Sequence, residues 1–178
     1  MKVAVLGAKG RMGAECVAAI NAASDLTLAA ALDLGDSLDQ LVSSGAEIVV
    51  DFTTPESVMK NLEFAINNGI HVVVGTTGID EGRLKQLKEL LSKKSGVGAL
   101  IAPNFGLGAV LMMQFSSTAA KYFESVEIVE MHHANKVDAP SGTAIRTAQM
   151  INDSRKQSGK GKMPDATKTE LPGSRGSK

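Results

Sequence analysis

The sequence predicts an α/β protein that begins with a doubly wound parallel sheet. Short apolar runs of strand length alternate with stretches that carry helix signals, and a glycine-rich loop directly follows the first run. Such alternation places helices on both faces of a parallel sheet, because the connections between parallel strands are right-handed. The length of 178 residues, with 43% hydrophobic and 21% charged, suits one soluble domain, or one domain with part of a second.

Five apolar runs have the length of strands in this sheet. They cover residues 2–6, 26–31, 47–51, 71–74 and 97–101. The segment Thr54-Pro55-Glu56 opens a helix over 54–67, because proline and an acid in the first turn favour a helix start. Asp80 opens another helix over 80–93. Gly69 and Gly96 follow these two helices, where a left-handed residue is needed.

The pattern changes after Phe105. A Met-rich helix is predicted over 107–121, a strand over 125–131 and a helix over 141–151. We therefore expect a dinucleotide-binding domain over 1–105 and a second, α+β domain over 106–178. From residue 154 onward the chain is rich in Gly, Ser, Pro and Lys, with seven basic and two acidic residues, which favours a solvated loop or tail. A nucleic-acid-binding arm is the alternative, although no aromatic residues are interleaved there.

Composition limits the partners and the compartment. The formal net charge is zero, so neither nucleic acid nor a membrane surface is indicated. The apolar run at the N-terminus is too short for a signal peptide core or a membrane span. The single cysteine, Cys16, suits a reducing compartment and is interpreted as a small buried hydrophobic residue rather than a reactive thiol. A cytoplasmic location is predicted.

The loop after the first run has the features of a dinucleotide-binding turn. Its glycines allow a tight turn and close approach of a pyrophosphate, and the following helix offers free N–H groups, as in Rossmann-type folds. Asp33 ends the second strand, where a carboxylate accepts ribose hydroxyls and favours NADH, whereas Lys9 and Arg11 could pair with the 2′-phosphate of NADPH. A plain glycine-rich turn is the alternative. The candidate residues are Gly7, Ala8, Lys9, Gly10, Arg11, Met12 and Asp33.

Further loops follow the carboxyl ends of later strands, where ligands bind in open α/β sheets. One is Asp51-Phe52-Thr53-Thr54. The other two are predicted to approach the nicotinamide end of the cofactor. Their candidate residues are Gly75, Thr76, Thr77, Ala102, Pro103, Asn104 and Phe105. Each of these loops is ordinary when taken alone, but with the glycine loop they make four on one edge of the sheet, which indicates a site.

Chemically active residues are densest between residues 130 and 144. His132 and His133 are adjacent, so on an extended segment they point to opposite faces and have different roles. A metal site is not expected, because thiolates are absent and carboxylates are not at ligand spacing. Buried core histidines are the alternative, which Lys136 and Asp138 nearby make costly. Ser141-Gly142-Thr143 opens a helix whose N–H groups and hydroxyls suit a carboxylate.

The run from His132 to Ala144, His-His-x-x-Lys-x-Asp-Ala-Pro-Ser-Gly-Thr-Ala, resembles the signature of dihydrodipicolinate reductases. The glycine loop and the two loops after the fourth and fifth strands occur in the same order in that family. The lysine and arginine of the glycine loop and Pro103 resemble the actinobacterial branch.

The resemblance implies a function and assigns roles. It implies reduction of 4-hydroxy-tetrahydrodipicolinate, a cyclic dicarboxylate, by NADH or NADPH on the route to diaminopimelate and lysine. His132 would be the acid/base residue and Lys136 the proton donor, and His133, Ser141, Gly142 and Thr143 would hold the substrate carboxylates. It also implies a homotetramer.

Family members continue past residues 173–176 with further strands, so relative to the family the second domain is expected to be incomplete. A catalytically inactive nucleotide-binding fragment is therefore the alternative to an active reductase. A different two-domain dehydrogenase is disfavoured by the signature between His132 and Thr143.

Overall fold

A computed structural model of the chain describes residues 1–102, 104–134, 136, 139–166 and 168. The chain forms two compact units, Met1–Ala102 and Pro103–Lys178. Each unit is described by itself.

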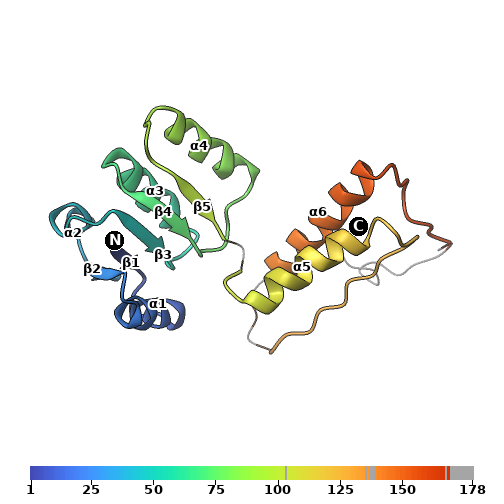
Figure 1. Cartoon of the computed structure of the whole chain (residues 1–178), viewed down its shortest axis with the longest axis horizontal. Coiled ribbons are helices and arrows are strands. Elements are labelled where there is room, and N and C mark those ends of the chain that lie inside the picture. Colours follow the sequence, from blue (N-terminus) through green and yellow to red (C-terminus); the bar gives the residue numbers. More distant parts are fainter. Residues whose placement is uncertain (103, 135, 137–138, 167, 169–178) are drawn as a thin grey trace. The chain divides into compact units, whose positions relative to one another are not determined.

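The first unit is a five-stranded parallel sheet, shown from blue to green in Figure 1. Its strands are β1 (Lys2–Leu6), β2 (Thr27–Leu32), β3 (Ile48–Asp51), β4 (His71–Val74) and β5 (Ala99–Ile101). The strand order is β2-β1-β3-β4-β5, and all four pairings are parallel. The predicted doubly wound α/β fold is confirmed.

Four helices connect the strands: α1 (Arg11–Ala22), α2 (Asp39–Ser43), α3 (Val58–Asn67) and α4 (Glu81–Ser92). The predicted start of α3 was four residues early, because Thr54–Ser57 form a turn in which the Thr54 carbonyl accepts from the amides of Ser57 and Val58. Asp80 caps α4, as its side chain accepts from the Arg83 amide. Gly69 and Gly96 have φ of 78° and 82°, in the left-handed region that was expected.

Alternate residues of β1 pack on opposite faces of the sheet. Val3 and Val5 pack with Ile20 and Cys16 of α1. Ala4 and Leu6 belong to the larger cluster, which α3 and α4 complete. Burial raises the pKa of the Cys16 thiol, which supports its interpretation as a packed hydrophobic residue. The sheet therefore has a core on each face, as a strand with side chains alternating in direction requires.

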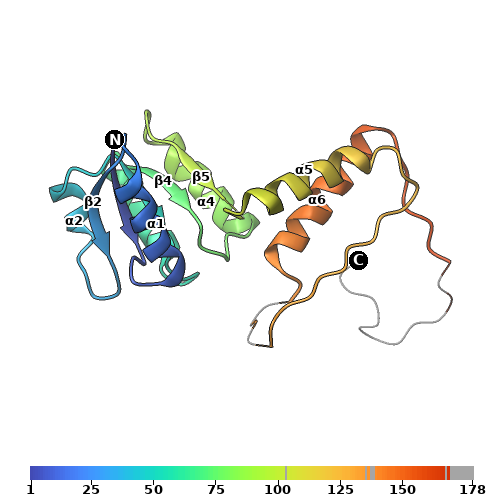
Figure 2. The ribbon, with the colours of Figure 1, turned by 60° about the horizontal axis from the view of Figure 1, so that its bottom comes forward.

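The second unit contains α5 (Leu107–Ala119) and α6 (Gly142–Gln157), which lie side by side in Figures 1 and 2. Polar contacts join them: the Ser154 hydroxyl donates to the Ser117 carbonyl at 2.7 Å. Arg155 is buried, and its guanidinium donates to the carbonyls of Ala120, Phe123 and Glu124 at the end of α5. The prediction of a loop or tail from residue 154 was wrong for 154–157, because these contacts prolong α6.

The strand predicted over 125–131 is not formed. The segment is extended but carries no ladder, and the described part of the second unit contains no other strand with which it could pair. Val129 and Met131 are 87% and 91% exposed. An isolated strand has no hydrogen-bonded neighbour to stabilise it, so the alternating pattern alone is insufficient.

Candidate functional site

The glycine loop folds tightly around Gly7 and Gly13. Gly7 has φ of 75°, and a Cβ on it would lie 2.6 Å from the Phe52 carbonyl oxygen. A Cβ on Gly13 would lie 2.0 Å from the carbonyl oxygen of Gly7, closer than any real contact. Both positions therefore require glycine. This packing draws the amino end of α1 against the carboxyl end of β1.

The first amides of α1 have the character of an anion site. All residues of α1 are described. Its N-cap, Gly10, provides no side-chain hydrogen bond, and its first turn contains no acidic residue. The leading N–H groups of an α-helix have no partner within the helix and carry its positive dipole end. Lys9 and Arg11 flank them. The loop therefore fits a pyrophosphate.

Asp33 lies beside this loop. Its Oδ2 accepts from the Lys9 amide at 2.7 Å and its Oδ1 from the Leu34 amide at 2.8 Å. These backbone N–H groups, with Leu34 contributing most, hold the pKa of the Asp33 carboxyl below its usual value. An ionised carboxylate with further lone pairs thus lies next to the glycine loop, where a ribose could donate to it.

The loop after β4 is hydrogen-bonded to the last residue of β3, Asp51. Thr76 is buried, and its hydroxyl donates to Oδ1 of Asp51 at 2.8 Å. The Gly75 amide donates to the Asp51 carbonyl at 2.9 Å. The Thr76 hydroxyl is thus engaged within the protein, while Thr77 is exposed.

The loop after β5 lies at the division between the units. Ala102 ends the first unit, and its amide donates to the Val74 carbonyl at 2.9 Å. Pro103 lies outside the described residues. Asn104 belongs to the second unit, where its Nδ2 donates to Oγ1 of Thr143 at 3.1 Å and its Oδ1 accepts from the Gly106 amide. Phe105 is 47% exposed.

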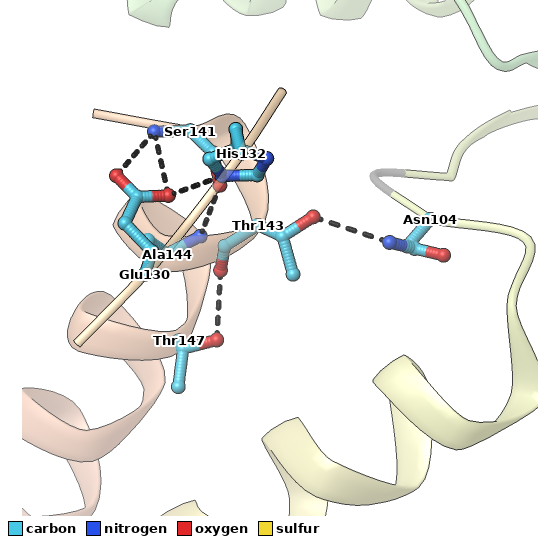
Figure 3. A network of polar contacts seen from close by, with 7 residues as sticks. All are labelled: Asn104, Glu130, His132, Ser141, Thr143, Ala144 and Thr147. Carbon is cyan, nitrogen blue, oxygen red and sulfur yellow. Dashed lines mark hydrogen bonds and ion pairs between the residues drawn. The ribbon is translucent and has the colours of Figure 1, made fainter. Parts of the chain in front are cut away.

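Figure 3 shows how Glu130 joins His132 to the amino end of α6. The Glu130 Oε2 lies 2.8 Å from Nε2 of His132, and Oε1 accepts from the Ser141 amide at 2.9 Å. The Ser141 side chain caps α6 by accepting from the Ala144 amide at 3.2 Å. One carboxylate therefore fixes the imidazole relative to the helix end that carries Gly142 and Thr143.

The charge of Glu130 is strongly favoured. The Ser141 backbone hydrogen bond, followed by the His132 side chain, lowers the pKa of the Glu130 carboxyl to about 2. His132 is 40% exposed and Glu130 29% by side chain. A partly exposed imidazole held by an ionised carboxylate is an arrangement suited to proton transfer.

The neighbouring His133 and Lys136 form a turn. The Lys136 amide donates to the His133 carbonyl at 3.2 Å, and the His133 side chain is exposed. Lys136 is half-buried. Within the second unit, Glu130 thus connects His132 to Ser141 at the start of α6, the helix that carries Thr143, and His133 and Lys136 belong to a turn that precedes this helix in the sequence.

Two residues that the sequence reasoning did not assign are Glu130 and Asp51. Glu130 could have been found from its spacing, because residues i and i+2 of an extended segment share a face and His132 is two residues on. Asp51 offered a weaker signal, a charged residue at the carboxyl end of an otherwise apolar strand. Among the described residues no group of three or more His, Cys, Asp or Glu could hold a metal ion. None of the described helices has the length and apolar character needed to span a bilayer.

Comparison with known proteins identifies the family. Residues 1–105 match the family described as dihydrodipicolinate reductase, N-terminus, and residues 108–176 match its C-terminus. The 4-hydroxy-tetrahydrodipicolinate reductase of Corynebacterium efficiens is 59% identical over 99% of this chain and 71% of its own length. That of Streptomyces avermitilis is 57% identical over 99% of this chain and 70% of its own.

A solved structure agrees with these relatives. The dipicolinate-bound dihydrodipicolinate reductase from Paenisporosarcina sp. TG-14 superposes with a TM-score of 0.76 at 35% identity, over 99% of this chain and 74% of that one. A myo-inositol 2-dehydrogenase from Lactobacillus plantarum, 11% identical over 68% of this chain and 42% of its own, shares the fold with a TM-score of 0.55. From the two family matches, which together span nearly its whole length, the chain belongs to the dihydrodipicolinate reductase family.

Proposed function

We propose that this protein reduces 4-hydroxy-tetrahydrodipicolinate to tetrahydrodipicolinate with NADH or NADPH, on the route to diaminopimelate and lysine. The observation that carries the proposal is the arrangement in Figure 3, in which Glu130 fixes His132 beside the amino end of α6. A proton-transfer group next to a carboxylate-binding helix end suits an anionic substrate that must gain a proton. Family membership supplies the substrate class.

The first unit would hold the dinucleotide. The α1 amides and the loop Gly7–Met12 would bind its pyrophosphate, and Asp33 would accept from the adenosine ribose, with Lys9 and Arg11 available to a 2′-phosphate. The backbone of Gly75–Thr77 is the part of the β4 loop assigned to the cofactor, because the Thr76 hydroxyl is engaged by Asp51. Ala102, Pro103, Asn104 and Phe105 complete the assignment. The reduced nicotinamide supplies the hydride when bound.

The second unit would grip the substrate. Ser141 donates its amide to Glu130, so the amides of Gly142 and Thr143 are the helix-end donors assigned to a carboxylate. The Thr143 hydroxyl accepts from Asn104, which leaves its own hydrogen to be donated. His133, exposed on the adjoining segment, is assigned to a second carboxylate.

Proton transfer is assigned to His132 and Lys136. Loss of the 4-hydroxyl as water converts the substrate to a conjugated ring. Hydride addition at C4 of that ring shifts negative charge toward the ring nitrogen, where a positioned cation lowers the barrier and a proton balances the charge. His132 is the acid/base residue, and Lys136 is the donor of the proton. Glu130 acts through His132, by holding the ring in one orientation.

The test is oxidation of NADH or NADPH, followed by absorbance, on addition of freshly prepared condensation product of aspartate semialdehyde and pyruvate. We expect turnover that requires both cofactor and substrate. Binding of dinucleotide without any turnover would instead favour a nucleotide-binding module. The homotetramer and the cytoplasmic location are further proposals, which light scattering of the purified protein and cell fractionation would test.

A further inference from the structure

Asp51 is a carboxylate with no exposed surface at the carboxyl end of β3, the central strand of the sheet. Its Oδ1 accepts from the Thr53 amide at 2.8 Å, from the Thr53 hydroxyl at 2.6 Å and from the Thr76 hydroxyl at 2.8 Å. Its Oδ2 accepts from Nδ2 of Asn61 at 2.9 Å. A buried carboxylate is tolerated only when donors surround it in this way.

These donors belong to different loops. Thr53 lies in the loop after β3 and Thr76 in the loop after β4. The segment next to Asp51 also forms the floor of the glycine loop, since the Phe52 carbonyl is the group that excludes a Cβ at Gly7. The loops after β1, β3 and β4, at the carboxyl edge of the sheet, therefore meet around Asp51 and the two residues that follow it.

Arg83 provides a second set of hydrogen bonds between these loops. The Arg83 guanidinium donates to the carbonyls of Pro55 and Gly78, both at 2.8 Å, and so joins the loops after β3 and β4 again. The Gly75–Thr77 segment therefore lies between the hydrogen bonds to Asp51 and those of Arg83, which fix it at both ends. Loops fixed before a ligand arrives lose less conformational entropy when it binds.

We propose that Asp51 is a positioning residue that, from the end of β3, presets the cofactor-binding loops after β1 and β4. The proposal rests on the function proposed above, in which those two loops bind NADH or NADPH. Asp51 has no exposed surface, so its effect on the dinucleotide is transmitted through Thr53, Thr76 and the backbone that they fix. Thr76 contributes to the cofactor site by holding its loop to Asp51.

The test measures the Kd of NADH for the full chain from the nucleotide's own fluorescence, which is convenient because the sequence contains no tryptophan. Asp51→Ala removes both carboxylate oxygens and leaves only the main-chain carbonyl as an acceptor, and we expect its Kd to rise by about tenfold or more. Asp51→Asn keeps an oxygen for Thr53 and Thr76, so its Kd should stay within about threefold of the parent. The matched control is Val49→Ala, a core change in the same strand that does not touch the loops.

A Val49→Ala protein with a similar loss of Tm should bind NADH as the parent does. Equal weakening in Asp51→Ala and Val49→Ala would reduce Asp51 to a stability residue and overturn the proposal, as would parental affinity in Asp51→Ala. Affinity as poor in Asp51→Asn as in Asp51→Ala would also overturn it. A parent chain that fails to bind NADH would refute the proposed function itself, which is a distinct result.

Thr76 provides a second route if Asp51→Ala does not fold. Thr76→Val is isosteric and removes only the hydroxyl that reaches Asp51, whereas Thr76→Ser keeps it. We expect the valine variant to bind NADH about threefold to tenfold more weakly and the serine variant to match the parent. Equal affinities in these two variants would contradict the loop-holding role.

Discussion

Different kinds of contact stabilise the interior of each of the two units. In the first unit the fully buried side chains are aliphatic, apart from Asp51 at the carboxyl end of the central strand β3. In the second unit the described buried residues are four polar and three apolar, and two of the polar ones, Ser154 and Arg155, join α6 to the end of α5. Phe115, Tyr122 and Phe123 are all more than half exposed there.

With the roles proposed above, this difference would separate cofactor binding from chemistry. The loops of the first unit are joined to a packed sheet through Asp51 and its hydrogen bonds, so errors there should appear as lost dinucleotide affinity. The second unit places its reactive side chains through a few hydrogen bonds on an extended segment, so its errors should appear as lost turnover. Variants that change one property without the other sharpen this comparison.

The largest expected effect is on turnover. His132→Ala or Lys136→Ala should lower kcat by roughly two to four powers of ten, since each removes a proton-transfer group. The Kd of NADH should be unchanged, because neither residue is assigned to the dinucleotide. Steady-state kinetics and fluorescence titration measure the two quantities. Unaltered kcat in both variants would remove these residues from the mechanism.

The next effect is on dinucleotide affinity. Gly13→Ala places a Cβ 2.0 Å from the Gly7 carbonyl oxygen, so the glycine loop must open. We expect the Kd of NADH to rise by about a hundredfold, as the anion site at the α1 end is lost. Gly10→Ala is the matched control, with its Cβ 3.2 Å from the same oxygen, and should lose far less. Comparable losses in both would mean that the contact at Gly13 does not set the loop.

The sequence predicted the first unit better than the second. Strand–helix alternation is a local signal, and it located all five strands because each is supported by its neighbours in the sheet. The alternating pattern over 125–131 is equally local, but nothing in the described part of the second unit pairs with it. The end of α6 was also missed, because Arg155 is stabilised by carbonyls more than thirty residues away in sequence.

The sequence likewise predicted some features of the candidate site and not others. Residue types and spacing predicted the glycine turn, Asp33 at the end of the second strand and the start of a helix at Ser141. The engagement of Thr76 by Asp51 was not predictable, because the partners are 25 positions apart and meet only through the pairing of β3 with β4.

A third prediction concerns the stability of the second unit. Arg155→Met should lower its free energy of unfolding by about 2 kcal/mol, since the carbonyls of Ala120, Phe123 and Glu124 lose a charged donor. NADH affinity should not change. Thermal unfolding measures the first quantity, with Arg146→Met as the control because that arginine is exposed on the same helix. Equal stability in the two variants would show that the Arg155 contacts contribute little.

The smallest effect is expected from Glu130→Gln. Glutamine keeps an oxygen for the Ser141 amide but cannot hold a protonated His132 as a carboxylate does, so kcat should fall by about tenfold or less with NADH affinity unchanged.

The Glu130→Gln variant should also remove a pH dependence of stability. The folded pKa of about 2 lies below the ordinary value of 4.5, so the stabilisation is present above about pH 4.5 and is lost as pH falls toward 2. Unfolding measured from pH 5 to pH 2 should therefore decline less steeply in Glu130→Gln than in the parent, whereas Glu124→Gln, an exposed carboxylate of the same unit, should follow the parent. Parallel curves for Glu130→Gln and the parent would mean that Glu130 does not hold the extended segment to α6, and the second unit would then need another account of how His132 is placed.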